Sequence, residues 1–359
     1  MAQLRRINFD STWLLTLPNP ADHPTSTCNL LIDPWLSDAE QIDLVVSFSG
    51  QKRQTAALAS SIGELESVLE QENVANSASD DRPPSNKIDA IVISHPFSDH
   101  LHPETLTDER VAERIPIFVT QDAEGALRKV LGSKGKSNSI TVIKAASMDT
   151  PPGWISEKSE NKNSTPLPNN MEILQALPQE KFLYFQGPAG MAWKKLHGGL
   201  IFLWRSTNAE SLNSIVYSPH GLTPKSIPTW LTNKELSIQH WAILTMFDKL
   251  ELPHWLSGTV NLGLAAVLEM IQGDSNTKPI YPARYIIDTH GEFKDMRGLI
   301  ARLLRRYWLN TDQLIQDFDA EREATRAEKA QQAIDQIEKT ENTTSKATLL
   351  QVGESVSFT

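Results

Sequence analysis

The chain lacks several features that would place it in a well-marked class. Its single cysteine, Cys28, excludes an internal disulfide bond among the 359 residues. Acidic residues outnumber basic ones by 44 to 34, and this argues against nucleic acid as the main partner, because phosphate binding requires a basic surface. No apolar run approaches the roughly 20 residues that a membrane-spanning helix needs. We therefore expect neither a nucleic acid nor a membrane as partner.

Targeting signals and nucleotide-binding motifs are also missing. The first residues, M-A-Q-L-R-R-I-N-F-D-S, contain no apolar signal core, which predicts an intracellular, cytoplasmic protein. The G-x-x-x-x-G-K-S/T, G-x-S-x-G and G-x-G-x-x-G patterns do not occur, so nucleotide binding and serine-hydrolase chemistry lose their usual support. A hydrophobic content of 40% nevertheless suffices to bury a sizeable core. We expect a soluble protein that acts on or binds a small molecule, with its oligomeric state open.

The first half of the chain alternates between strand and helix patterns. We expect strands over residues 11–17, 28–32, 42–48, 88–94, 115–120 and 140–145. Helices are expected over residues 62–72, after Pro103 and over residues 122–131. This order predicts an α/β architecture. Residues 150–170, rich in Pro, Ser, Asn and Lys, predict a mobile insertion.

The second half begins with a β-rich block and then repeats the strand-to-helix pattern. Strands are expected over residues 172–177, 181–185, 200–204, 214–217 and 284–287. Helices are expected over residues 258–271 and in the segment with apolar residues at 296, 299, 300, 303 and 304. We predict one domain over residues 1–310, a charged helical extension over 311–342 and a disordered tail over 343–359.

The first polar cluster directly follows the apolar run 90–93. His95, Asp99 and His100 have the spacing H-x-x-x-D-H, and His102 follows two residues later. Imidazole and carboxylate groups are suitable ligands for zinc or iron, and a short loop can direct them to one point. The alternative is a loop in which Asp99 caps the next helix and the histidines only form hydrogen bonds.

Two further histidines follow strands in the second half. His220 lies in the segment Y-S-P-H-G, and His290 lies in D-T-H-G-E. Of the two residues Asp288 and His290, we take His290 as the better candidate for a site. A histidine at a strand end is also common as a purely structural residue, and this alternative stays open for both.

The order of these elements and motifs resembles the metallo-β-lactamase superfamily, in particular its lactonase-like branch. I-V-I-S-H-P-F-S-D-H is similar to the H-x-H-x-D-H signature of that family, and Asp33-Pro34-Trp35 is similar to an early strand and aspartate. The segment from Asp288 to Lys294 resembles the terminal T-H-D-E-x-K. The resemblance covers residues 10–305 and implies an αββα sandwich in which each half contributes a histidine loop.

The sequence departs from the family pattern at three places. Phe97 stands where the signature has its second histidine, His220 replaces the bridging aspartate, and no histidine follows the strand 172–177. The residues that remain as metal ligands are His95, Asp99, His100, His220 and His290, with His102 as a local reserve. The resemblance thus implies one zinc ion rather than two, with iron, manganese or no metal as alternatives.

On this basis we expect a hydrolase that uses a metal ion to activate water against an ester, lactone or phosphoester. Asp99 would orient the water or shuttle its proton, and His220 or His290 would polarise the substrate oxygen. The alternatives are a metal-free member of the fold that binds a ligand or partner protein, and a non-hydrolytic lyase or isomerase.

Overall fold

The computed structural model describes most of the chain. The described residues are 2–19, 27–43, 48–76, 86–132, 139–156, 167–168, 170–177, 196–205, 211–256, 258–272, 280–290, 294–307, 346–348 and 350–358. Within these ranges, no helix is both long and apolar enough to cross a membrane.

The N-terminal half builds a seven-stranded sheet with the order β19-β1-β2-β3-β6-β7-β8. Strands β3, β6, β7 and β8 run parallel, whereas β19, β1, β2 and β3 pair antiparallel. The parallel strand β6 is wholly apolar because both of its faces are buried. The strands are β1 (Ala2–Arg6), β2 (Trp13–Pro18), β3 (Thr27–Ile32), β6 (Ala90–Ile93), β7 (Ile117–Thr120), β8 (Ile140–Ile143) and β19 (Ser355–Phe358).

The second half builds a six-stranded sheet with the order β18-β15-β12-β11-β10-β9. Strands β9, β10 and β11 pair antiparallel, and β11, β12, β15 and β18 run parallel. The strands are β9 (Met171–Ala176), β10 (Gly199–Arg205), β11 (Leu212–Tyr217), β12 (Ile238–Thr245), β15 (Tyr285–Asp288) and β18 (Lys346–Thr348).

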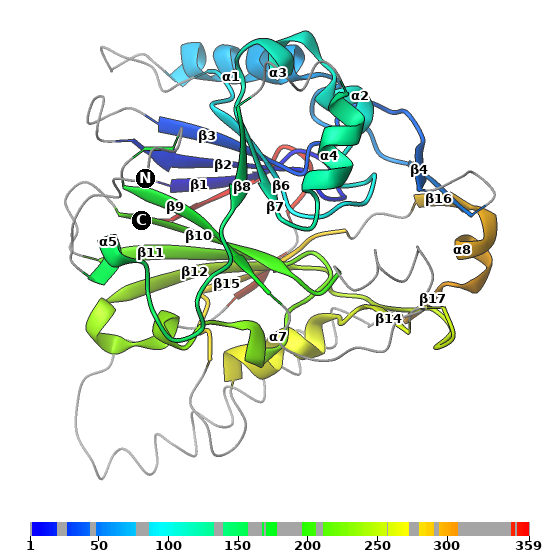
Figure 1. Cartoon of the computed structure of the whole chain (residues 1–359). Helices are drawn as coiled ribbons and strands as arrows, with labels where there is room; N and C mark the ends of the chain where they lie inside the picture. Colours follow the sequence, from blue (N-terminus) through cyan, green and yellow to red (C-terminus); the bar gives the residue numbers. More distant parts are fainter. Residues whose placement is uncertain are drawn as a thin grey trace.

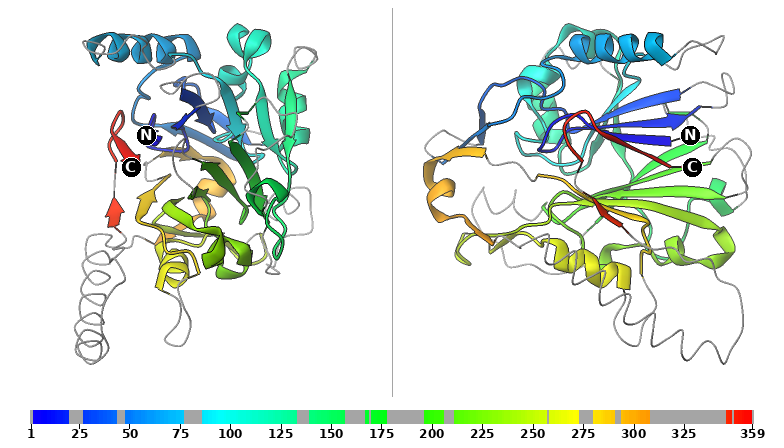
Figure 2. Two further views of the ribbon diagram at one scale, coloured as in Figure 1. Left: turned by 90° about the vertical axis from the view of Figure 1, so that its left-hand side faces the viewer. Right: turned by 180° about the vertical axis from the view of Figure 1, so that it is seen from behind.

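The two sheets pack face to face, with helices on their outer faces (Figures 1 and 2). Trp13 and Leu15 of β2 point into the core between the sheets, whereas Leu14 between them points to the helices, as the two-residue period of a strand requires. Helix α7 (Leu264–Gln272) covers the second sheet. The helices on the first sheet are α1 (Ile62–Asn76), α2 (Pro103–Leu106), α3 (Glu109–Arg114) and α4 (Glu124–Leu131).

Smaller elements form a cap at one end of the two sheets. Two three-stranded sheets, β14-β13-β17 and β16-β5-β4, lie there together with helix α8 (Gly298–Leu303) (Figure 1). Their strands are β4 (Gln41–Asp43), β5 (Ser49–Arg53), β13 (Lys249–Glu251), β14 (Thr259–Asn261), β16 (Lys294–Arg297) and β17 (Arg305–Tyr307). The remaining short helices are α5 (Gly153–Ser156), η2 (Pro224–Ser226), η3 (Thr229–Thr232) and η4 (Lys234–Leu236).

The mixed α/β class predicted from the sequence is confirmed, and most predicted elements occur within a few residues of their expected bounds. Two predictions were wrong in detail, and some strands were not predicted. Residues 259–261 form β14 rather than the start of a helix, residues 294–297 form β16, and the eight-residue strand β12 was not foreseen. Strand β14 pairs with the preceding strand β13, and β16 pairs with β5, which is distant in the sequence. In both cases strand pairing overrides the helical spacing of the apolar residues.

The C-terminal segment also differs from the expectation. We expected residues 343–359 to be disordered, but β18 pairs with β15, and β19 pairs with β1. The fold therefore extends beyond the predicted domain limit of residue 310. The predicted helical extension 311–342 and the predicted strand 181–185 lie outside the described residues. Within the predicted insertion, residues 153–156 form α5, and Trp154 is buried against the second sheet.

Candidate metal centre

The candidate residues come together where strands of both sheets end. His95, Asp99 and His100 follow β6, His220 follows β11, and His290 follows β15. All five side chains are buried. Ligand atoms of His95, His100 and His220 lie within 4.8 Å of one another, as do those of Asp99, His100 and His290. The structure thus joins the motifs that the sequence separates by almost two hundred residues.

His100 is oriented by the carboxylate of Asp33. Its Nδ1 donates to Asp33 Oδ2 at 2.7 Å, so its Nε2 faces the other histidines. Asp33 also accepts hydrogen bonds from the hydroxyl of Tyr217 at 2.7 Å and from the backbone and hydroxyl of Ser94. Burial lowers the pKa of His100, but Asp33 and Asp99 outweigh it and raise the pKa above its ordinary value. A carboxylate behind a histidine is the usual support for a metal ligand.

His220 is oriented in the same way by an amide. Its Nδ1 donates to Asn261 Oδ1 at 2.6 Å, which leaves the lone pair on Nε2 directed at the site. His220 Nε2 lies 3.1 Å from His100 Nε2, and both Nδ1 atoms are already donors. Two lone pairs at this distance repel unless a proton or a cation lies between them. Burial lowers the pKa of His220 to about 3, so a proton there is costly.

His290 has an unusual backbone conformation that directs its ring to the site. Its φ angle is 58°, and its N–H donates to the carbonyl of Asp10 at 3.1 Å. Its Nδ1 lies 3.3 Å from Thr289 Oγ1, whose own hydroxyl donates to the Asp10 carbonyl. Nδ1 is therefore the donor, and Nε2 has a lone pair with no hydrogen-bond partner among the residues that the structure describes. This buried lone pair is therefore available to a ligand.

Asp99 faces these lone pairs. Its Oδ1 lies 3.8 Å from His100 Nε2, and its Oδ2 lies 3.9 Å from His290 Nε2. Ligands at about 2.0–2.1 Å from a tetrahedral zinc ion are about 3.3 Å apart, so these separations need only small adjustments. Burial raises the pKa of Asp99, but Lys294 and the histidines outweigh it and hold the pKa well below its ordinary value. The residues present therefore fit a divalent metal ion.

His95 lies beside the other rings but makes different contacts. Its Nε2 lies 2.9 Å from the carbonyl oxygen of Leu196, which can only accept, so this nitrogen is a donor and has no lone pair to offer. Its Nδ1 lies 2.7 Å from Ser94 Oγ. The side chain of His102 caps the start of α2, where its Nδ1 accepts a hydrogen bond from the backbone N–H of Thr105. The structure thus gives His102 a capping role rather than that of a reserve ligand.

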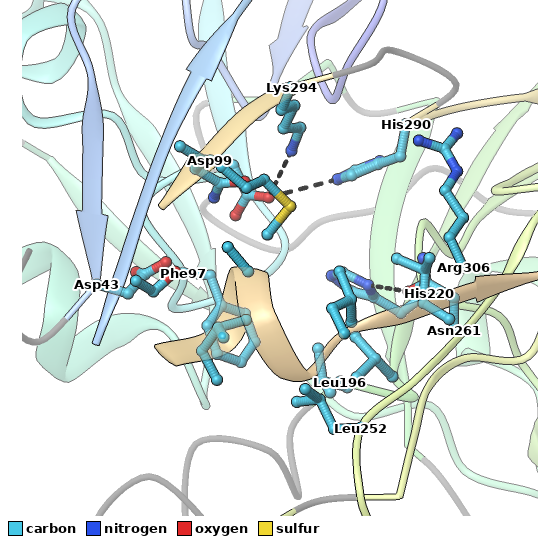
Figure 3. A pocket seen from close by; sticks show the side chains of 18 of the residues that line it. Asp43, Phe97, Asp99, Leu196, His220, Leu252, Asn261, His290, Lys294 and Arg306 are labelled. Atoms are coloured by element: carbon cyan, nitrogen blue, oxygen red, sulfur yellow. Dashed lines mark hydrogen bonds and ion pairs between the residues drawn. The ribbon is translucent and has the colours of Figure 1, made fainter. Parts of the chain in front are cut away.

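A cavity of about 430 Å³ opens onto the cluster (Figure 3). Asp99, His220, His290 and Lys294 line its polar end. Phe97 packs into an apolar cluster with Leu196, Leu252, Val260 and Ile300, and the cap elements supply most of this wall. The residue that replaces the expected second histidine is therefore part of an apolar pocket wall.

Sequence reasoning missed three polar residues of the site, Asp10, Asn261 and Lys294. Lys294 Nζ lies 2.8 Å from Asp10 Oδ2 and 3.1 Å from Asp99 Oδ2. Burial lowers the pKa of Lys294, but the two carboxylates outweigh it and raise the pKa above its ordinary value. Burial raises the pKa of Asp10 to about 6. The polar run around Asp10, directly before the apolar strand β2, was a usable signal, whereas nothing in the sequence distinguished Asn261.

The charges within the cluster favour a divalent cation. Asp10, Asp33 and Asp99 can contribute three negative charges, and Lys294 contributes one positive charge. A divalent ion would balance the remaining two negative charges of these groups, which reduces the desolvation penalty.

Comparisons with known proteins do not identify the chain: no family model and no curated protein matches its sequence.

Proposed function

We propose that this protein is a metal-dependent hydrolase that holds a single divalent ion between Asp99, His100, His220 and His290. The observation that supports this best is the shared orientation of three imidazoles. His100, His220 and His290 each donate a hydrogen bond from Nδ1 to an oxygen atom of the protein. Each directs its Nε2 lone pair toward the Asp99 carboxylate or toward a neighbouring Nε2. Nitrogen and carboxylate ligands suit zinc best, and iron or manganese also accepts them.

A divalent ion held there would polarise an ester, lactone or phosphoester oxygen and lower the pKa of water toward about 7. The residues of the chain provide the rest. Asp99 would bind the ion through one carboxylate oxygen and would accept a hydrogen bond from the attacking water through the other, while His220 and His290 line the cavity into which the substrate carbonyl or phosphoryl group would enter. Phe97 and Leu196 exclude bulk water from one side, which strengthens the electrostatic interactions within the site.

The layered fold supports membership of the metallo-β-lactamase superfamily as part of this proposal. Two sheets face each other, helices cover both outer faces, and each sheet contributes site residues at its strand ends. Phe97 and the hydrogen bond from His95 to Leu196 remove ligands for one of the two ions of that family. The ligands that remain are Asp99, His100, His220 and His290, and this favours a site with one metal ion.

Metal content tests the proposal first. Protein purified without chelator should contain one zinc, iron or manganese ion per chain by elemental analysis. His100→Ala should lose that ion, and His254→Ala, at an exposed histidine, should retain it. Turnover of a lactone, a thioester and a phosphodiester should then depend on the ion. Wild-type protein that contains no metal above background, with no difference in His100→Ala, would contradict the proposal.

A metal-free binding protein is the second candidate, and the ion pair of Lys294 with Asp10 and Asp99 favours it. This pair partly neutralises the carboxylates without any metal. The same measurements separate the possibilities. Metal without hydrolysis favours a lyase or isomerase that uses the histidines as acids and bases, and the absence of both favours binding of a small ligand or partner protein.

A further inference from the structure

Lys294 is a fixed cation at the polar end of the cavity. Its side chain is only 10% exposed, and its ammonium lies between Asp10 and Asp99, 5.4 Å from the centre of the Trp35 ring. Lys294 follows His290 closely in the sequence and begins β16, so the cap positions it rigidly. Figure 3 shows its side chain directed at Asp99, beside the ring of His290.

The hydrogen-bonding capacity of Lys294 exceeds these two contacts. An ammonium group has three N–H donors, and one each is directed at Asp10 and Asp99. Lys294 also lines the cavity, so the third donor can reach a bound molecule. Arg306 also lines the cavity, but its Nε and Nη2 both donate to Asp248, at 2.8 and 2.6 Å. Of these two cavity-lining cations, Lys294 is the one whose ammonium contacts the proposed ligand Asp99.

We propose that Lys294 and the bound ion together form an oxyanion subsite, in which Lys294 donates a hydrogen bond to an anionic oxygen of the ligand. This inference rests on the proposed function. A second metal ion would supply positive charge to that oxygen, but Phe97 and the donor role of His95 Nε2 remove its ligands. Lys294 supplies such a charge from a fixed position, as preorganised oxyanion sites do.

The ligand that fits this subsite has one tetrahedral anionic group and an apolar substituent. The anionic oxygens would contact the ion and Lys294, and the substituent would lie against the apolar wall formed by Leu196, Leu252 and Ile300. n-Butylphosphonate combines both features and is not hydrolysed, which makes it a suitable probe.

The test measures n-butylphosphonate binding to zinc-loaded protein by calorimetry. Lys294→Met should raise the Kd for n-butylphosphonate at least tenfold while the zinc content stays unchanged. Lys294→Arg, which keeps the charge, should raise the Kd by less. Lys129→Met removes an exposed lysine on α4 and should bind the probe like the wild type. Should Lys294→Met fail to fold, Lys294→Gln keeps N–H donors for both carboxylates and provides the same comparison.

Two outcomes would overturn the role of Lys294 while leaving the proposed function intact: zinc-loaded wild-type protein that does not bind the phosphonate, and a Lys294→Met variant that binds it as tightly as the wild type. Wild-type protein that binds no zinc would instead overturn the proposed function, and the oxyanion subsite with it.

Discussion

Nε2 of His100 lies 3.1 Å from Nε2 of His220, although 120 residues separate the two histidines in the sequence. Each ring is fixed from behind, His100 by Asp33 and His220 by Asn261. Neither ring can turn its N–H toward the other without breaking a buried hydrogen bond, which typically costs about 1–3 kcal/mol. A cation or an added proton between the two Nε2 atoms would therefore stabilise the close approach, and the supporting residues determine the properties of the site.

Asp33→Asn should weaken metal binding about 10- to 100-fold, because it removes the negative charge behind His100 and leaves one acceptor oxygen where the carboxylate uses two. The measurement is the zinc Kd by competition with a chromophoric chelator. Asp149→Asn, at an exposed aspartate, is the matched control. Tyr217→Phe, which removes only one donor to Asp33, should have a smaller effect. An unchanged Kd in Asp33→Asn would show that the charge of the buried carboxylate does not contribute to metal binding.

Phe97→His should not create a second metal site, although it restores the histidine of the family signature. A second ion would also need His95, whose Nε2 donates to the Leu196 carbonyl at 2.9 Å. We expect elemental analysis after dialysis against zinc to give one ion per chain in both wild type and variant. Two ions in the variant would show that the hydrogen bond of His95 yields to a metal and that Phe97 alone restricts the stoichiometry.

His240 should make the protein sensitive to acid by a route separate from the metal centre. It donates to the backbone of Leu231 and its Nδ1 lies 2.9 Å from Ser214 Oγ, so the neutral ring satisfies both contacts. Burial lowers its pKa from 6.5 to about 4. The unfolded chain binds a proton below pH 6.5 and the folded chain does not until about pH 4, so this stability is complete above pH 6.5 and is lost as the pH falls toward 4.

The corresponding experiment compares urea unfolding at pH 7.5 and pH 5.0 in the presence of EDTA. The titration of His240 should contribute a loss of about 2 kcal/mol over this interval. His240→Gln keeps one donor and one acceptor without titrating. Its loss of stability between pH 7.5 and pH 5.0 should therefore be smaller than that of the wild type by about 2 kcal/mol. His254→Gln, at an exposed position, should behave like the wild type. Equal losses in all three proteins would contradict the role of His240.

The motifs that lie at the ends of apolar strands were predictable from the sequence, whereas their supporting contacts were not. His220 and His290 were identified because each follows a strand, and the structure brings both to the cluster around Asp99. Asn261 could not be identified, because its value to the site depends on the pairing of β14 with β13 in the cap. The sequence also gave no reason to place Lys294 between two carboxylates, since Asp10 is distant in the chain.

The same limitation explains the wrong prediction for the C-terminal segment, where two short strands were mistaken for disorder. S-V-S-F has few apolar residues, but β19 gains a partner in β1, and Phe358 is 3% exposed. Its ring lies 5.6 Å from the ring of Trp241 and 6.0 Å from that of Tyr285, measured between centroids. Both partners belong to the other sheet, so Phe358 joins the two sheets at their edges.

Phe358→Ala should therefore lower the free energy of unfolding by about 3 kcal/mol, the usual cost of removing a buried phenylalanine ring. Urea denaturation of the metal-free protein measures the change. Ser357→Ala, at the neighbouring exposed position of the same strand, is the control and should change stability by less than about 0.5 kcal/mol. If both variants unfold like the wild type, β19 does not contribute to the core. A large loss confined to Phe358→Ala would place the last strand among the elements that hold the two sheets, and with them the two halves of the metal centre, in register.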